Sequence, residues 1–309
     1  MAETRRSDAI ALIGFGEVGQ ILAWDLAGAG VEDIRAWDIA FDRPESAPSR
    51  ALPGHPVRPA ASAIDAVRGA SLVISAVTAE EDLQAAQSAV PGLAPGAFFL
   101  DLNSCSPGQK VKSAAVIEAA GGRYVESAVM NPIAPRRIAS SMLLGGPHAA
   151  AFLAAADGLG FLGARVFSPV IGQAAAAKLC RSVITKGVEA LLTESMLAAR
   201  RHGVEQTVLA SLSDLLPLPD WPATARYMIG RSLEHGARRA EEMREAARTV
   251  AESFVEPLLS EAIAARQAWT AGFAEALGEG DLGALLDAIN RRIDHQGGRS
   301  TAPGAPVLD

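Results

Sequence analysis

The chain has 309 residues, of which 49% are hydrophobic and 20% are charged. A chain of this length and composition can form about two domains with a sizeable core, so general disorder is excluded. The net charge of −7 argues against nucleic acid or an anionic membrane as the main partner, and two cysteines are too few for a disulfide framework.

The N-terminal sequence MAETRRSDAI lacks the long apolar stretch of a signal peptide, and no uncharged apolar run reaches membrane-spanning length. We therefore expect a soluble, cytoplasmic protein with no membrane association. No cysteine and histidine residues have the spacing of a zinc site, so we also expect no metal.

The first expected strand, residues 9–13, is a short apolar run that meets three glycines at the spacing G-x-G-x-x-G. The following sequence, EVGQILAWDLAGAG, places apolar side chains at helical spacing, so strand, turn and helix have the order of a dinucleotide site. Gly14 would form the tight turn, Gly16 would let a pyrophosphate approach, and Gly19 would let the helix pack on the strand. We predict that the cofactor contacts Gly14, Phe15, Gly16, Glu17, Val18 and Gly19.

Asp38 ends the second expected strand, DIRAWD, nineteen residues after Gly19. A carboxylate at this position accepts hydrogen bonds from the ribose hydroxyls of NAD and repels the 2′-phosphate of NADP. Arg43 could instead contact that phosphate, so NAD is favoured and NADP stays possible. Two alternatives remain open here: a glycine turn without a ligand, and a methyltransferase-type nucleotide fold.

Strand and helix patterns then alternate. The expected strands are GASLVISAV, GAFFLDLNS, RYVESAV, SSMLLGG and ARVFSP, and the expected helices between them include EEDLQAAQSAV and GQKVKSAAVIEAAG. This alternation predicts a parallel sheet, and ligands of such sheets lie beyond the carboxyl ends of the strands. Val77 and Thr78 lie at the end of the first of these strands, Asn103 follows the second, and Met130 and Asn131 follow the third. We expect Val77, Thr78 and Asn103 to contact the cofactor. We expect Asn103, Met130 and Asn131 to contact the substrate.

After about residue 169 the pattern is helical. One long helical pattern begins at IGQAAAAKLC, and a later one covers residues 231–254. In the later pattern the apolar or small positions are Leu233, Ala237, Ala240, Met243, Ala247, Val250 and Phe254. The sequence therefore predicts an α/β Rossmann-type domain (residues 1–169) followed by an all-α domain (170–296), joined by a long helix, with a flexible tail at 297–309.

Four segments, IGFGEVG, DLNSCSP, YVESAVMNP and IGQAAAAKLCRS, resemble in order the motifs of the β-hydroxyacid dehydrogenase superfamily. This superfamily includes 3-hydroxyisobutyrate dehydrogenase and 6-phosphogluconate dehydrogenase. The resemblance covers about residues 10–194. The C-terminal part resembles the divergent helical domain of an uncharacterised subgroup.

The resemblance implies that Lys178 is the general acid/base and that Ser182, where the family has Asn, contacts the substrate. It also implies a homodimer formed through the helical domain. The substrate loop departs from the family, because Met130, Asn131 and Pro132 replace its Ser-Gly-Gly. A proline has no N–H to offer a carboxylate.

The charged face of residues 231–254 favours a solvated surface with weak ion pairs. The alternative is that His235 and Arg239 of this helix close over the substrate. Taken together, these patterns predict an NAD(P)-dependent oxidoreductase acting on a small polar substrate resembling a hydroxy acid. An imine reductase of the same architecture and a non-catalytic NAD-binding sensor remain alternatives.

Overall fold

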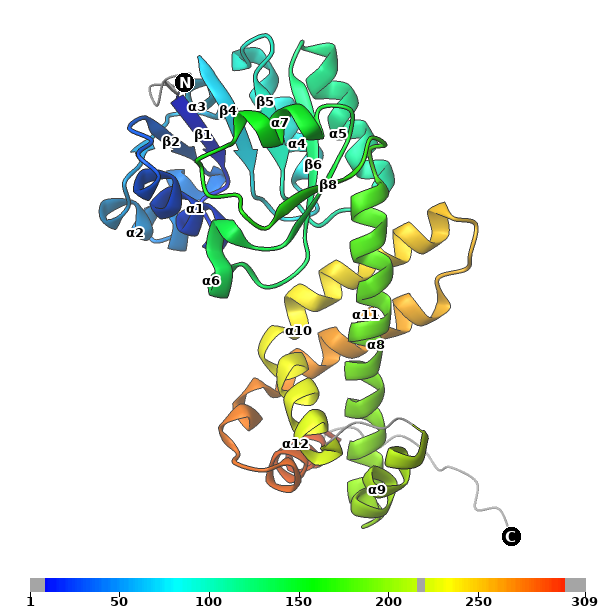
Figure 1. Ribbon diagram of the computed structural model, residues 1–309. Helices are drawn as coiled ribbons and strands as arrows, with labels where there is room; N and C mark the ends of the chain where they lie inside the picture. The colour runs from blue at the N-terminus through cyan, green and yellow to red at the C-terminus, as the bar shows by residue number, and fades with distance from the viewer. Residues whose placement is uncertain (1–8, 216–219, 298–309) are drawn as a thin grey trace. The chain divides into compact units, whose positions relative to one another are not determined.

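A computed structural model describes residues 9–215 and 220–297, and the chain falls into two compact units (Figure 1). The first unit combines Met1–Arg181 with Arg248–Val255, and the second combines Ser182–Ala247 with Glu256–Asp309. No described helix is both long enough and apolar enough to cross a membrane. The predicted tail lies outside the described residues from residue 298 onward.

The first unit is built on an eight-stranded sheet with the strand order β3-β2-β1-β4-β5-β6-β7-β8. Its strands are β1 (Ala9–Ile13), β2 (Ile34–Trp37), β3 (Arg58–Pro59), β4 (Ala70–Ser75), β5 (Phe98–Asp101), β6 (Arg123–Val129), β7 (Met142–Gly145) and β8 (Ala164–Ser168). Neighbouring strands are parallel except β6 and β7, in which Val129 lies opposite Met142. The predicted parallel sheet is therefore confirmed from β1 to β6, and the direction expected for β7 and β8 is wrong.

The reversal at β7 follows from the short connection before it. A parallel neighbour needs a crossover that carries the chain back to the other edge of the sheet. After β6 the chain forms only the one-turn helix α6 (Ile133–Arg136) and a 3₁₀ turn (Arg137–Ala139). The chain therefore stays at the carboxyl edge and re-enters the sheet in the opposite direction.

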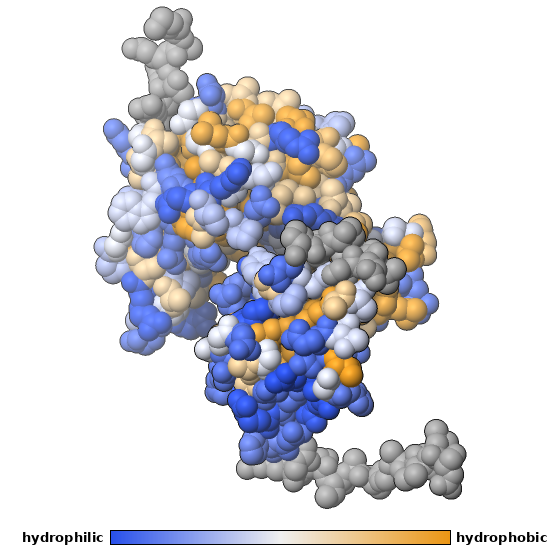
Figure 2. Space-filling model, turned by 60° about the horizontal axis from the view of Figure 1, so that its bottom comes forward, coloured by the Kyte–Doolittle hydropathy of each residue, from blue (hydrophilic) through white to orange (hydrophobic). Residues whose placement is uncertain are grey.

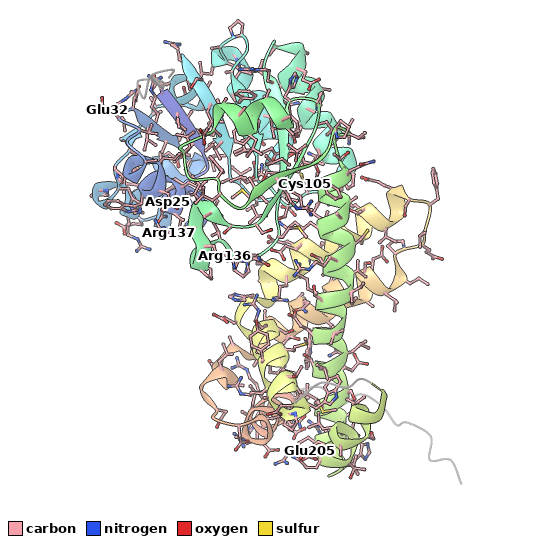
Figure 3. The ribbon with its side chains drawn as sticks, viewed as in Figure 1. Asp25, Glu32, Cys105, Arg136, Arg137 and Glu205 are labelled. Carbon is pink, nitrogen blue, oxygen red and sulfur yellow. The ribbon has the colours of Figure 1, made fainter. Side chains whose placement is uncertain are left out.

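Arg137 holds this turn in place and has an uncommon backbone, with a φ of +55°. Asp25 of α1 accepts a hydrogen bond from Arg137 Nε at 2.7 Å and another from the backbone N–H of Ile138 at 2.9 Å. Figure 3 shows Asp25 and Arg137 side by side. One carboxylate thus links the turn after β6 to the helix that follows the glycine loop.

Helices cover both faces of the sheet (Figure 1). The helices packed on one face are α1 (Glu17–Gly28), α2 (Ala47–Ala51), α6 and α7 (Ala149–Ala155), and those on the other are α3 (Ala63–Val67), α4 (Asp82–Ala89) and α5 (Pro107–Ala119). Strand β1 shows why both faces are apolar: Ile10 and Leu12 pack into the first layer, and Ala11 and Ile13 into the second. A short, wholly apolar run is typical of a strand buried on both faces.

The second unit is helical. The helices that follow β8 are α8 (Gln173–Arg201), α9 (Glu205–Leu215), α10 (Trp221–Glu252), α11 (Leu258–Thr270) and α12 (Leu282–Gly297). Leu192, Met196, Trp221, Ile229 and Leu285 belong to the core of this unit. The predicted fold class, a Rossmann-type α/β part followed by an all-helical part, is confirmed.

Helix α10 follows the predicted stripe only in part. Leu233 and Met243 are buried as expected, whereas Ala237 is exposed and Phe254 is fully exposed. The reason at Phe254 is that α10 ends at Glu252, and Phe254 takes a left-handed φ of +62°. This is the position after a helix end that glycine usually occupies, and it directs the side chain away from the helix stripe.

The charged face of α10 also differs from the prediction of a solvated surface. Arg238 and Glu242 form the expected ion pair one turn apart, at 3.3 Å. Arg239 and Glu245, in contrast, are buried. Their burial means that α10 packs against neighbours over more of its circumference than the apolar stripe alone indicates.

Candidate active site

The glycine loop between β1 and α1 meets three different requirements. Gly14 has a φ of +95°, and a Cβ on it would lie 2.3 Å from the carbonyl oxygen of Ala76. A Cβ on Gly19 would lie 2.3 Å from the carbonyl oxygen of Gly14. A Cβ on Gly16, however, would meet no atom within 4 Å. Packing thus explains Gly14 and Gly19, while Gly16 leaves open space where a pyrophosphate fits against the backbone.

The first turn of α1 lies next to this space. Gly16 is the N-cap of α1, and no side chain caps the helix. The N–H groups of such a turn and the positive end of the helix dipole attract phosphate. Glu17 is exposed and Val18 is partly buried. Phe15 is fully buried, with its ring 5.3 Å from that of His55, so it offers a ligand its backbone rather than its side chain.

Asp38 lies at the end of β2, beside the glycine loop. Its Oδ2 accepts a hydrogen bond from the N–H of Phe15 at 2.7 Å, and its Oδ1 accepts one from Ala40 at 2.8 Å. A carboxylate has about four acceptor positions, so these two bonds orient the group and leave capacity for ribose hydroxyls. Arg43, the possible phosphate ligand, is exposed and lies 3.7 Å from Asp42.

Asn103 faces the interior of the first unit. Its Oδ1 accepts a hydrogen bond from the N–H of Val77 at 2.7 Å, and its Nδ2 donates to Asp82 at 2.7 Å and to Ser75 at 3.0 Å. The residue is only 4% exposed. The amide joins the loop after β5 to the loop after β4, where Thr78 is exposed. The predicted contact of Asn103 with substrate and cofactor stays a prediction.

A buried charged network supports Asn103. The backbone N–H of Asn103 donates to Asp101 Oδ1 at 2.8 Å, and Lys110 Nζ lies 2.7 Å from the same oxygen. The hydroxyl of Tyr124 donates to the other oxygen of Asp101 at 2.5 Å. Ser113 donates to Asp82 at 2.6 Å. The loops at the carboxyl edge of β4 and β5 thus rest on two carboxylates and one ammonium inside the protein.

Burial and neighbouring charges shift the protonation of this network in different directions. Burial, reinforced by the nearby Asp82 carboxylate, raises the pKa of Asp101 to about 7 against the opposing charge of Lys110. Burial alone would lower the pKa of Lys110, but the carboxylates of Asp101 and Asp82 outweigh it and raise this pKa. The pKa of Asp82 is lowered, because the attraction of Lys110 and several hydrogen bonds exceed the effect of burial.

Cys105 lies beside the same network. Burial raises the pKa of its thiol, so it has little thiolate character. Potential ligand atoms of Asp82, Asp101 and Cys105 lie within 4.8 Å of one another. The Lys110 ammonium at Asp101 supplies positive charge at this place.

Lys178 lies on the second turn of α8, and its Nζ donates a hydrogen bond to Ser104 Oγ. Ser104 follows β5 directly after Asn103, so the amino group reaches the carboxyl edge of the sheet that carries the glycine loop. The side chain is partly buried, with Ala174 and Leu179 buried near it along the helix. Lys178 therefore does not extend into open solvent as an ordinary surface lysine does.

Glu126 holds the beginning of α8. This side chain of β6 is fully buried, and its two oxygens accept hydrogen bonds from the N–H groups of Gly172 and Ala175. A Cβ on Gly145 would lie 2.8 Å from Glu126 Oε2, so the opposite strand needs a glycine there. A carboxylate at a helix N-terminus pairs with free N–H groups and the positive dipole end. Glu126 thereby positions the turn that precedes Lys178.

The predicted substrate loop begins where β6 ends. The N–H of Met130 donates to Ser141 at 2.9 Å, and its carbonyl oxygen accepts a hydrogen bond from Arg181 Nη1 at 2.7 Å. Asn131 and Pro132 are exposed. The structure thus brings Met130 close to a residue of α8 that the sequence analysis had not selected.

The remaining predicted substrate residues, Ser182, His235 and Arg239, belong to the second unit. Arg239 is buried and forms an ion pair with Glu189. Burial lowers the pKa of Arg239, and it raises the pKa of Glu189. Gln267 is fully buried, with its amide 3.4 Å from Glu189 Oε2. Arg239 therefore contributes to the interior of the second unit, and its predicted contact with substrate stays a prediction.

Ser182 and His235 are partly buried. His235 Nε2 lies 3.3 Å from Glu234, and burial lowers the pKa of the imidazole. Close by in sequence, Lys186 is buried and lies 2.5 Å from Glu242, and burial lowers the pKa of Lys186. The roles of Ser182 and His235 at a substrate also stay predictions.

Sequence reasoning missed several residues that hold the site. They are Asp82, Asp101, Lys110, Tyr124, Glu126 and Arg181. The available signal was a charged residue inside an otherwise apolar segment, as with Glu126 in RYVESAV. Such residues are buried only when they have partners.

Residues 9–172 match the family model described as the NAD binding domain of 6-phosphogluconate dehydrogenase. The chain belongs to this family. Residues 199–270 match a domain of unknown function, DUF1932. No curated protein matches the chain. Membership of this family means that residues 9–172 form an NAD-binding domain, and it identifies the chain as an NAD(P)-dependent oxidoreductase.

Solved structures agree with this family. A conserved hypothetical protein from Sinorhizobium meliloti 1021 is 32% identical, with a TM-score of 0.74 over 92% of this chain and 96% of that one. The conserved protein MTH1747, described as similar in structure to 3-hydroxyacid dehydrogenases, is 29% identical, with a TM-score of 0.68 over 88% of this chain and 100% of that one.

The 3-hydroxyisobutyrate dehydrogenase of Mycobacterium tuberculosis shares the fold at 20% identity, with a TM-score of 0.68 over 92% of this chain and 99% of that one. The resemblance to β-hydroxyacid dehydrogenases inferred from four sequence motifs is confirmed.

Proposed function

We propose that the protein is an NAD-dependent dehydrogenase that transfers hydride between the nicotinamide and a hydroxyl-bearing carbon of a small hydroxy-acid-like substrate. The observation that supports this proposal most strongly is the hydrogen bond from Lys178 to Ser104 at the carboxyl edge of the NAD-binding sheet. The bound nicotinamide supplies the hydride chemistry, and the protein supplies orientation and proton transfer.

Lys178 is the general acid/base in this proposal. When the hydroxyl-bearing carbon loses hydride, its hydroxyl must lose a proton, and the amino group of Lys178 accepts it. In the reverse direction the Lys178 ammonium donates that proton to the forming alcohol. Ser104 orients the amino group, and Glu126 fixes the helix turn before it.

The preference for NAD over NADP rests on Asp38. Its carboxylate is oriented by the N–H groups of Phe15 and Ala40 at the end of β2. A negative charge at this place accepts bonds from ribose hydroxyls and repels a 2′-phosphate. The ion pair of Arg43 with Asp42 further reduces the attraction that Arg43 exerts on a phosphate.

Turnover with NAD and with NADP across a panel of hydroxy acids, sugar acids and their esters tests the function. We expect at least one member to be oxidised, faster with NAD than with NADP, as followed by the absorbance of the reduced cofactor. Reduction of imines without oxidation of any alcohol would favour an imine reductase. NAD binding without turnover of any compound would favour a sensor, and either result would contradict the proposal.

We also propose that the second unit forms a homodimer. Large apolar side chains of α8 and α11 are 63–74% exposed in this unit: Ile184, Leu191, Leu258 and Leu259. Figure 2 shows hydrophobic areas, in orange, among hydrophilic ones on the surface. Burial of one such side chain contributes about 1.5–3 kcal/mol, so a second copy that covers several of them would be bound stably.

Sedimentation equilibrium tests the dimer. We expect a mass of two 32.0 kDa chains for the unmodified protein. Leu259→Glu should weaken association about tenfold or more, because a charge replaces a buried apolar group. The matched control is Leu162→Glu, a change at an 89% exposed residue of the first unit, which should not alter the mass. A monomer before any substitution would contradict the proposal.

A further inference from the structure

The loop after β6 has few backbone groups with which to hold an acidic substrate. The N–H of Met130 is engaged with Ser141 at 2.9 Å, and Pro132 has no N–H. Asn131 is exposed and keeps an amide side chain. A carboxylate bound next to Lys178 therefore needs a further donor from outside this loop.

Arg181 lies at this loop. It is the last residue of the first unit, its side chain is exposed, and its Nη1 donates to the carbonyl oxygen of Met130 at 2.7 Å. Because Arg181 follows Lys178 by three residues in α8, the two side chains share one face of the helix. A guanidinium has five N–H donors in a planar fork that matches a carboxylate.

The charges around this point favour an anion. Lys178 and Arg181 both carry positive charge on the same helix face. The closest acidic side chain on β6, Glu126, is fully buried, and its oxygens accept bonds from Gly172 and Ala175.

We propose that Arg181 binds the carboxylate of the substrate and so takes the place of the missing donors of the loop. Three residues of a helix rise about 4.5 Å. The substrate carboxylate at Arg181 and the substrate hydroxyl at Lys178 are therefore separated by the length of a short carbon chain. The substrate class is thus a short hydroxy acid with a free carboxylate, rather than an ester or a neutral alcohol. This assignment rests on the proposed function.

Binding of malonate to the complex with NADH tests Arg181 without any turnover. We expect Arg181→Met to weaken malonate binding about tenfold or more, which is the usual effect of losing a charged hydrogen bond. Arg181→Lys should recover part of the affinity because it keeps the charge. The matched control is Arg165→Met, which removes an exposed arginine of β8 and should leave malonate binding unchanged. NADH affinity should be equal in all four proteins.

Kinetics with 3-hydroxypropanoate and its methyl ester give the second readout. Arg181→Met should raise KM for the acid about tenfold or more and change KM for the ester much less, with similar kcat. A purely structural role of Arg181 would instead affect acid and ester equally, and that result would overturn the proposal.

The two proposals fail in different ways. If malonate does not bind the unmodified NADH complex, or binds Arg181→Met equally well, the role of Arg181 is wrong whatever the activity. If malonate binding depends on Arg181 but no compound is turned over, the dehydrogenase is wrong and the anion site stands.

Discussion

Replacement of Lys178 by methionine is expected to lower kcat by about 10²–10⁴-fold, the usual contribution of a general acid/base. Methionine keeps an unbranched stem but cannot accept or donate the proton of the substrate hydroxyl. The glycine loop lies on other elements of the sheet, so NADH affinity should stay within about twofold. Steady-state kinetics and an NADH fluorescence titration measure the two quantities separately.

The control for this change is Lys112→Met, which removes an exposed lysine of α5 in the same unit. It should leave both kcat and NADH affinity unchanged. If Lys178→Met retains the kcat of the unmodified protein, another group moves the proton. If it loses NADH binding as well, Lys178 serves the structure of the site rather than the chemistry.

Replacement of Lys110 by methionine is expected to lower the free energy of unfolding by about 3–5 kcal/mol near neutral pH, the usual cost of leaving one partner of a buried ion pair alone. Asp101 and Lys110 are both buried, and their charged groups lie 2.7 Å apart. Without the ammonium, Asp101 and Asp82 remain as two carboxylates in the interior. Urea unfolding followed by circular dichroism measures the change.

The loss should depend on pH, because the pKa of Asp101 is raised to about 7 by burial and Asp82. A carboxyl group whose pKa is raised by folding stabilises the folded state, and this contribution is complete at pH values below the pKa of the unfolded chain, about 4. The contribution is lost as pH rises through the folded-state pKa of about 7. At about pH 5 Asp101 holds its proton, so Lys110→Met is tolerated better than at about pH 8. The double variant Asp101→Asn with Lys110→Met should recover part of the stability at the higher pH. Equal losses at both pH values would contradict the role of Lys110 as the partner of Asp101.

The parts of the fold that depend on short segments were predictable. The turn at Gly14 and Gly19 could be predicted from its glycines, because a side chain at either position would collide with nearby backbone. Strand β1 could be predicted because both its faces are buried, so its sequence is a wholly apolar run. The direction of β7 could not be predicted, because it depends on the length of the connection after β6 rather than on the residues of β7 itself.

Candidate site residues could be chosen from the sequence where they lie in local motifs, and not where their position depends on distant partners. Lys178 and Asp38 follow from motif position, whereas the internal orientation of Asn103 depends on Asp82, which is 21 residues away. Glu126 and Gly172 are 46 residues apart, and neither segment indicates the other. The sequence shows which side chains have suitable chemistry, and the tertiary contacts decide which of them face a ligand.

The position of Glu126 has a consequence for how this protein can evolve. Glu126 attaches α8 to the interior of β6, four residues before the loop that begins at Met130. Mutations in the exposed loop at Asn131 and Pro132 can therefore accumulate without moving the helix turn that presents Lys178. The loop can therefore change in such a chain while the helix turn that carries Lys178 is inherited unchanged.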